Sequence, residues 1–159
     1  MPATVRRATP QDAEQVAEIL REIMADTTES VGFDAALSPA DVVLWMQRHG
    51  DNGALFVTDD GRHLLAFGSV DFNSARPLEC VLGAWVRPLN RRQGHATALA
   101  EEGIAFARDH GYRKVRARLP EGNEAALSFL SSIGALVPLM NPGATYELPL
   151  YPDQREQAE

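Results

Sequence analysis

The chain of 159 residues carries a formal net charge of −7 and is 45% hydrophobic, which suits a single folded domain and excludes a disordered chain. No apolar run approaches the roughly 18 residues of a transmembrane helix, and the first residues lack the apolar segment of a signal peptide. The single cysteine, Cys80, excludes an internal disulfide and a metal site built from cysteines, so we expect a cytoplasmic protein.

The N-terminal half alternates strand-like and helix-like patterns. Apolar residues recur every three or four positions between Val16 and Ile23, which predicts an amphipathic helix that begins after Thr9. Ser38 and Pro39 are typical of the start of a second helix. The elements expected here are strands over residues 4–7, 54–58 and 64–72 and helices over residues 9–24 and 38–49.

The C-terminal half continues this alternation. Gly111 suits the end of a long helix, and Asn141-Pro142-Gly143 is a typical turn between two strands. The elements expected here are strands over residues 78–87, 114–119, 135–140 and 145–150 and helices over residues 94–110 and 123–132. We therefore expect one α/β domain over residues 1–151 and a polar C-terminal tail over residues 152–159.

Charge is distributed unevenly along the chain. Residues 11–60 contain eleven acidic residues and two arginines, whereas residues 85–120 contain eight basic and three acidic residues. Either two solvated helix faces or a pair of sites, one for a polyanion and one for a cation, would produce this pattern. The net acidity argues against a general nucleic-acid-binding protein.

The most informative segment is Trp85-Val86-Arg87-Pro88-Leu89-Asn90-Arg91-Arg92-Gln93-Gly94-His95-Ala96-Thr97, which has the pattern of a strand, a turn and a helix start. Gly94 and Ala96 leave room for a ligand to approach the backbone, so the N–H groups of the first helical turn can bind an anion. Arg91 and Arg92 add positive charge beside this helix end. The segment lacks the Walker A and dinucleotide-binding signatures, and phosphate is the anion that we expect.

Arg91-x-x-Gly94-x-Ala96 resembles the Q/R-x-x-G-x-G/A signature of the GNAT N-acetyltransferase superfamily. Val86-x-Pro88 stands before it as the family's V-x-P does, and Asn123-x-x-Ala126 with Gly134-Ala135 resembles the family's second motif. The resemblance implies a single-domain GNAT fold, in which helices flank a mixed central sheet whose fourth and fifth strands splay apart. The N-terminal region loosely resembles the phosphinothricin-acetyltransferase-like branch of the family.

The resemblance also implies that acetyl-CoA binds as a co-substrate where those two strands part. The pantetheine arm would pair with the backbone of the fourth strand, and the pyrophosphate would bind the loop and the helix start. The cofactor-binding residues implied in this way are Ala84, Trp85, Val86, Arg91, Arg92, Gln93, Gly94, His95, Ala96, Thr97 and Asn123. No metal is expected, because the four histidines do not have the spacing of metal ligands.

The chemistry that the resemblance implies is direct attack of an amine on the thioester after the amine has lost a proton. Glu79 is the candidate base, although an exposed glutamate at a strand start is the simpler interpretation, and Val81 stands where the phosphinothricin-type acid would be expected. Leu130 replaces the family tyrosine that protonates the departing thiolate. Ser131 and Tyr146 are substitutes to consider, and the general acid stays unassigned.

The acidic loop that contains Asp26, Glu29 and Asp34 favours a small cationic amine as the acceptor. Two alternatives to an enzyme stay open: a non-catalytic acyl-CoA-binding module, to which the missing tyrosine points, and a basic segment that binds RNA. An enzyme would release free CoA when it is offered amines, and a module would not. We expect no membrane or nucleic-acid partner, and the resemblance leaves a homodimer open because dimers are common in the family.

Overall fold

Helices and strands alternate along the part of the chain that the structure, a computed structural model, describes: residues 3–26, 33, 35–118, 137–138 and 145–149. Its strands are β1 (Thr4–Arg7), β2 (Ala54–Asp59), β3 (Leu64–Phe72), β4 (Glu79–Val86), β5 (Lys114–Arg118), β6 (Val137–Pro138) and β7 (Thr145–Pro149). Its helices are α1 (Ala13–Asp26), α2 (Pro39–His49) and α3 (His95–Asp109), with the 3-10 turns η1 (Pro10–Asp12) and η2 (Pro88–Asn90). These elements match the expected ones, and the helix expected over residues 123–132 lies outside the described residues.

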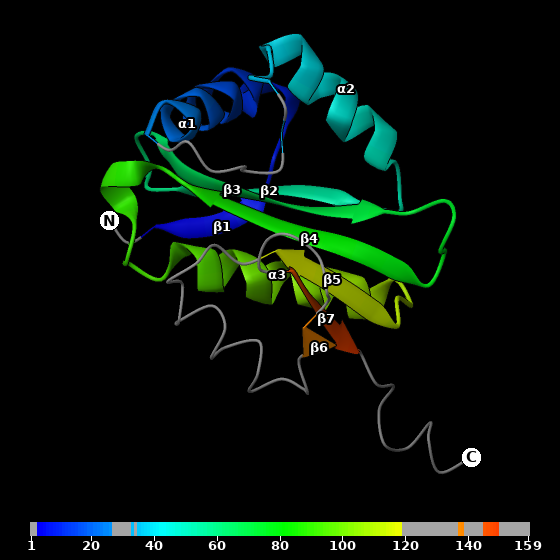
Figure 1. Ribbon diagram of the computed structural model, residues 1–159. Coiled ribbons are helices and arrows are strands. Elements are labelled where there is room, and N and C mark those ends of the chain that lie inside the picture. Colours follow the sequence, from blue (N-terminus) through cyan, green and yellow to red (C-terminus); the bar gives the residue numbers. More distant parts are fainter. Residues whose placement is uncertain (1–2, 27–32, 34, 119–136, 139–144, 150–159) are drawn as a thin grey trace, which may run out of the picture.

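The strands form one sheet in the order β1-β2-β3-β4-β5-β7-β6. β4 and β5 are parallel, and the other neighbouring strands are antiparallel. Helices α1 and α2 cover one face of the sheet, and α3 covers the other (Figure 1). The expected α/β fold with a mixed central sheet flanked by helices is therefore confirmed.

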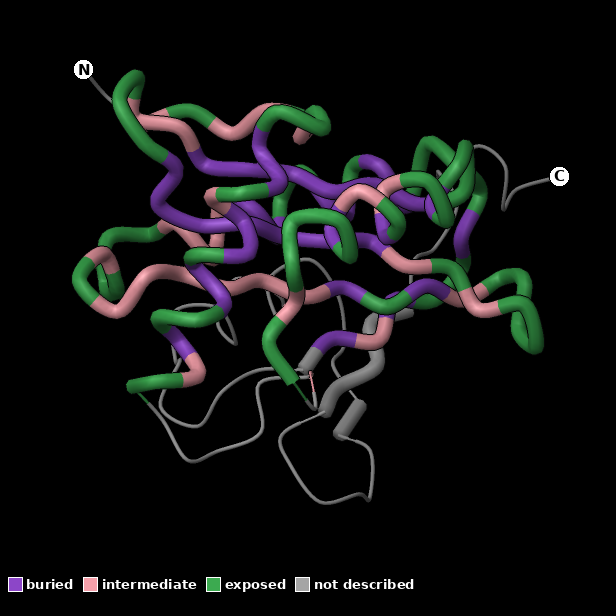
Figure 2. Tube along the Cα trace, turned by 90° about the horizontal axis from the view of Figure 1, so that it is seen from above, coloured by how far each residue is buried: buried purple, intermediate pink, exposed green. Residues whose placement is uncertain are grey.

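Two apolar clusters fill the layers on either side of the sheet, and the buried residues run through the middle of the molecule (Figure 2). Alternate residues of each strand point to opposite faces. Thus Phe67 of β3 packs with α1 and α2, whereas the next apolar residue along the strand, Val70, packs in the cluster of α3. The central strands β2 and β3 are buried over nearly their whole length because helices cover both of their faces.

Short polar contacts fix where the helices begin. Ser38 is the N-cap of α2: its hydroxyl oxygen accepts the N–H of Asp41 at 3.1 Å, and the Asp41 carboxylate accepts the N–H of Ser38 at 2.9 Å. At η1, the Asp12 carboxylate accepts the N–H of Thr9 at 2.8 Å and binds both terminal nitrogens of Arg6. The Asp12 carboxylate thereby joins β1 to the start of α1.

The pairing of β4 with β5 is short and ends in the middle of β4. Residues Glu79 to Leu82 face Lys114 to Ala117, and the rest of β4 is in register with β3 alone among the described strands. This is the expected separation of the fourth and fifth strands. From Gly83 to Val86, β4 therefore has a neighbouring strand on its β3 side only, among the described strands.

Candidate functional site

The loop between β4 and α3 has an unusual backbone. Arg92 and Gly94 both have positive φ angles, of 64° and 84°, and residues Arg91 to Gly94 are exposed. A non-glycine residue in the left-handed region is strained by about 1 kcal/mol or more and persists where the surroundings require it. Left-handed residues in a loop can turn backbone amides toward one point and so form a concavity that binds an anion, and an anion site in this loop stays a prediction.

The start of α3 supplies further donors. Gly94 is the N-cap, no side chain caps this end, and the N–H of Ala98 makes the first helical hydrogen bond, to the Gly94 carbonyl at 3.1 Å. The preceding N–H groups, of His95, Ala96 and Thr97, have no acceptor within the helix. They point out of the positive end of a fifteen-residue helix. These donors and the loop lie next to each other at the start of α3.

The basic side chains near this loop differ in their partners. Arg87 is ion-paired with Glu18 and Glu22 of α1 and donates its Nε–H to the Leu64 carbonyl at 2.7 Å. Arg91 pairs with Asp26 at 3.0 Å. Arg92 has no ion pair among the described residues, so its guanidinium is the one that an incoming phosphate meets without displacing a carboxylate.

The three residues expected to contact pantetheine lie on the exposed edge of β4. Ala84, Trp85 and Val86 are half-buried and are in register with β3 on one side only, among the described strands. The side chain of Val86 packs with the cluster on the α3 face, and that of Trp85 packs on the opposite face. Their side chains therefore belong to the core, and a contact with the co-substrate through their backbone stays a prediction.

Glu79, the candidate base, lies at the start of β4 and is mostly buried. Its Oε2 is 3.5 Å from Nη1 of Arg76 and 3.4 Å from Nε of Arg116. The side chain is 13% exposed, and Oε2 makes no hydrogen bond within the described part of the chain. Glu79 is thus a mostly buried carboxylate that lies between two arginines, and not a freely solvated one.

A second polar cluster, which the sequence analysis did not predict, lies on the sheet face under α2. Oδ1 of Asp71 accepts hydrogen bonds from Nε1 of Trp45 at 2.6 Å and from Nε2 of His49 at 2.7 Å, and Oδ2 accepts one from the Ser69 hydroxyl at 2.9 Å. Burial raises the pKa of Asp71, but the bonds from His49 and Trp45 outweigh it and the net pKa is lowered. Asp71 is therefore an ionised carboxylate.

Aromatic rings surround this cluster. Trp85 stacks on Phe67 with ring centroids 4.8 Å apart, and Phe33 and Trp45 pack against the same indole at 5.2 and 6.2 Å. The indole also lies over Gly83, where an added Cβ would come within 2.3 Å of it. Gly83 is therefore required for the position of Trp85.

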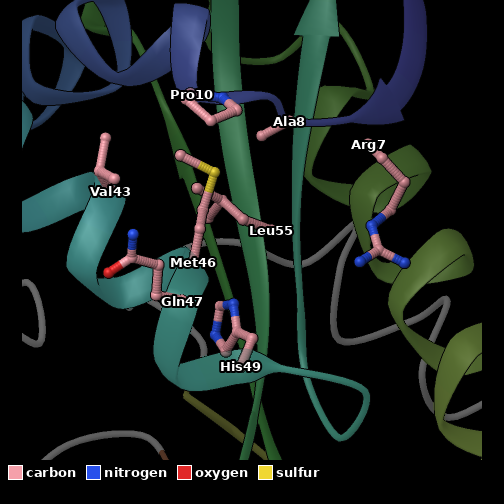
Figure 3. Close-up of a pocket in the computed structure, with 8 residues that line it drawn as sticks. All are labelled: Arg7, Ala8, Pro10, Val43, Met46, Gln47, His49 and Leu55. Carbon is pink, nitrogen blue, oxygen red and sulfur yellow. The ribbon is translucent and has the colours of Figure 1, made fainter.

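A cavity of about 270 Å³ lies between α2 and the N-terminal segment, and Figure 3 shows its lining. Val43, Met46 and His49 line it from α2, while Arg7 lies apart from the others and places its guanidinium over Phe56 and Phe106. None of the expected cofactor-binding residues lines this cavity. It is separate from the loop and from the opening between β4 and β5.

Several expected residues cannot be placed in this geometry. Asn123, Leu130 and Ser131 lie outside the described residues, as do Glu29 and Asp34 of the acidic loop. Tyr146 lies in β7 opposite Ala117, and its side chain is not described. His95, expected to act through its backbone, has a ring that contacts Oε1 of Gln93 at 3.1 Å.

Within the described ranges, no three His, Cys, Asp or Glu side chains come together as a metal site would require. The helices among those residues include none that is long and apolar enough to span a bilayer.

The model of the acetyltransferase (GNAT) domain family matches residues 3–136 of the chain. No curated protein matches in sequence, but many solved structures are similar in fold. One is yncA from Salmonella typhimurium, described as a putative acetyltransferase with its cofactor acetyl-CoA: the TM-score is 0.77, the identity is 17%, and 95% of each chain is covered. The phosphinothricin acetyltransferase of Sinorhizobium meliloti in complex with acetyl-CoA has a TM-score of 0.75 at 20% identity, with 94% of this chain and 89% of that chain covered.

Proposed function

Because the chain belongs to the acetyltransferase (GNAT) domain family, we propose that it transfers the acetyl group of acetyl-CoA to a primary amine of a small, cationic acceptor. Membership of the family confirms the expectation of an acetyltransferase. The region matched by the family, residues 3–136, lies inside the domain that we assign to residues 1–151. The observation that carries the proposal is the anion-binding start of α3 beside the opening between β4 and β5.

The residues of the loop would hold the diphosphate of the co-substrate. The N–H groups of residues 92–97 would donate to it, and Arg92 and Arg91 would add charge. The open edge of β4 would pair with the pantetheine arm through the backbone of Ala84, Trp85 and Val86. Gln93 and His95 complete the loop, and Asn123 is the contact that we propose from the segment that follows β5.

Acetyl-CoA supplies the activated acyl group, and the protein has to deliver the amine without its proton. An alkylammonium titrates near pH ~10, so at neutral pH the reactive form is rare. Glu79, acting directly or through a water, is the proton acceptor that we propose. A backbone N–H near Trp85 or Val86 would stabilise the negative charge that develops on the acyl oxygen.

One feature of the sequence favours a second candidate function, a module that binds acyl-CoA without turnover. Leu130 stands where the family has the tyrosine that protonates the thiolate. CoA is a fairly good leaving group, because its thiol has a pKa not far from the ~8.5 of cysteine. Loss of the tyrosine therefore lowers the rate without abolishing the reaction, and we favour the enzyme.

The test is a calorimetric titration of the full chain with acetyl-CoA, followed by a panel of amines with detection of released thiol. The protein itself contributes little background, because Cys80 is buried and its pKa is raised to about 12 by that burial and by the charge of Asp71. Binding with thiol release is the expected result. Binding without release for every amine would support the module, and no binding would overturn the account of the loop.

A further inference from the structure

Asp71 carries a negative charge in an unusual place. It lies in β3 directly opposite Val81 of β4, on the face of the sheet that α1 and α2 cover. Its side chain is 35% exposed, and Val81 beside it is 42% exposed. None of the ion pairs among the described residues joins Asp71 to an arginine or a lysine. The carboxylate thus has a solvent-facing side next to an apolar residue.

The hydrogen bonds of Asp71 fix its orientation. Trp45, His49 and Ser69 all donate to it from within the fold. A carboxylate only accepts hydrogen bonds, so Nε2 of His49 carries the hydrogen in this contact. Oδ2 accepts one hydrogen bond from the described residues and can accept more.

Asp71 lies near the opening between β4 and β5. The last paired residue of β4 is Leu82, so Val81 and Asp71 flank the point where the strands part. Successive residues on one face of a strand are about 7 Å apart. Because the indole of Trp85 lies over Gly83, an acceptor has to approach beside Val81, which would place its reacting nitrogen at the β4–β5 opening roughly one such step from Asp71.

We propose that Asp71 binds a second, non-reacting cationic group of the acceptor, which makes the preferred acceptor a diamine-like dication and not a simple monoamine. This rests on the proposed function. The reacting amine must lose its proton, and a carboxylate held by three donors would keep an ammonium protonated. The partner of Asp71 is therefore the other charge of the acceptor. Trp45 donates to Asp71 and its ring lies 6.2 Å from that of Trp85, so aromatic rings lie beside the carboxylate.

The network also has a purely structural interpretation, in which it joins α2 to β3. Trp45 and His49 both belong to α2, and His49 packs against the position of Gly53. A structural network would destabilise the fold when it is removed but would not discriminate between acceptors. Selectivity between two amines is therefore the informative readout.

The experiment compares diaminobutane with butylamine, which has the same carbon chain and one ammonium fewer. We expect the wild-type chain to prefer diaminobutane by about tenfold in KM. Asp71→Asn should remove this preference by raising the KM of diaminobutane toward that of butylamine, while Asp51→Asn, an exposed control, should retain it. Equal KM values for the two amines in the wild type, or a preference that survives in Asp71→Asn, would overturn the proposal.

A second variant keeps the test valid if Asp71→Asn does not fold. Val81→Lys places an ammonium opposite Asp71 at an exposed position, and should abolish the diamine preference with the network intact. Val81→Gln is its uncharged control and should keep the preference. If both variants keep it, the proposal is wrong.

Binding provides a readout that does not depend on turnover. Trp45 and Trp85 are the chain's two tryptophans, so fluorescence of the protein with CoA should respond to diaminobutane at lower concentration than to butylamine. A fluorescence preference for diaminobutane without thiol release would overturn the proposed enzyme and support the Asp71 site. Thiol release without any preference would support the proposed enzyme and overturn the Asp71 site.

Discussion

Arg91, in the loop before α3, is ion-paired with Asp26, the last residue of α1. The two side chains are 46% and 47% exposed, and such a pair contributes about 0–1 kcal/mol to stability. The pair links the loop proposed to bind phosphate to the acidic segment proposed to favour a cationic acceptor. It is weak enough for a phosphate to replace the carboxylate.

Removing the carboxylate of Asp26 should therefore leave Arg91 free to bind the phosphates of acetyl-CoA. Asp26→Asn is expected to tighten acetyl-CoA binding by about threefold at low salt, within the range of an exposed ion pair, and the gain should vanish at high salt. Calorimetric titration measures both. Arg91→Ala should weaken binding by about tenfold, and in that background Asp26→Asn should have no further effect. An effect of Asp26→Asn that persists without Arg91 would contradict this coupling.

A negative charge in the loop should have the largest effect on the co-substrate. Gly94 has a φ of 84° and open space around a built Cβ, so Gly94→Glu strains only the backbone, by about 1–2 kcal/mol, while its carboxylate occupies the phosphate position. We expect a stable protein that no longer binds acetyl-CoA.

Gly61 is the matched control for this variant. It has a φ of 92°, nothing within contact distance of a built Cβ, and lies in the turn between β2 and β3. Gly61→Glu should cost the same stability and leave acetyl-CoA binding unchanged. If the two variants bind acetyl-CoA equally well, the assignment of the phosphate loop is wrong.

The elements were predictable because their signals are local. Thr9, Ser38 and Gly94 mark helix starts within a few residues of sequence. The loop motif is equally local, so Arg91 and Gly94 are sufficient to predict an anion site there, and that site stays a prediction.

The cluster around Asp71 could not be predicted in this way. Trp45 and His49 are 26 and 22 residues away from Asp71 in sequence, and only the packing of α2 on β3 brings them together. The one available signal was an acidic residue within an otherwise apolar strand. The same reason explains why the ion pairs of Glu79 were missed, since Arg116 reaches it from β5.

The role of Glu79 can be tested by a neutral substitution of the same size. If Glu79 accepts the proton of the amine, Glu79→Gln should lower kcat by about 10²-fold or more at neutral pH, with partial recovery at high pH, where free amine is abundant. Acetyl-CoA affinity should not change. A pH–rate profile identical to that of the wild type would remove Glu79 from the mechanism, and Asp51→Asn, an exposed substitution, serves as the control.

Acid sensitivity should depend on Asp12, whose carboxylate receives hydrogen bonds of 2.8 and 2.9 Å from the guanidinium of Arg6. These bonds, opposed by burial and aided by the N–H of Thr9, lower the pKa of Asp12. The unfolded carboxyl titrates near pH ~3.9, so the stabilisation is complete above that value and is lost as the pH falls through the folded pKa.

Asp12→Asn should therefore lower the free energy of unfolding by about 2 kcal/mol at neutral pH, the value of a hydrogen bond to a charged group. It should also make the loss of stability between about pH 5 and 3 shallower, because the variant no longer takes up that proton on unfolding. Urea denaturation across this range measures both effects. Asp51→Asn, an exposed substitution, should change neither the stability nor its slope with pH. Because the pKa of Asp71 is also lowered, some acid dependence should remain in Asp12→Asn, and a slope equal to that of the wild type would show that the Arg6 pair does not contribute to it.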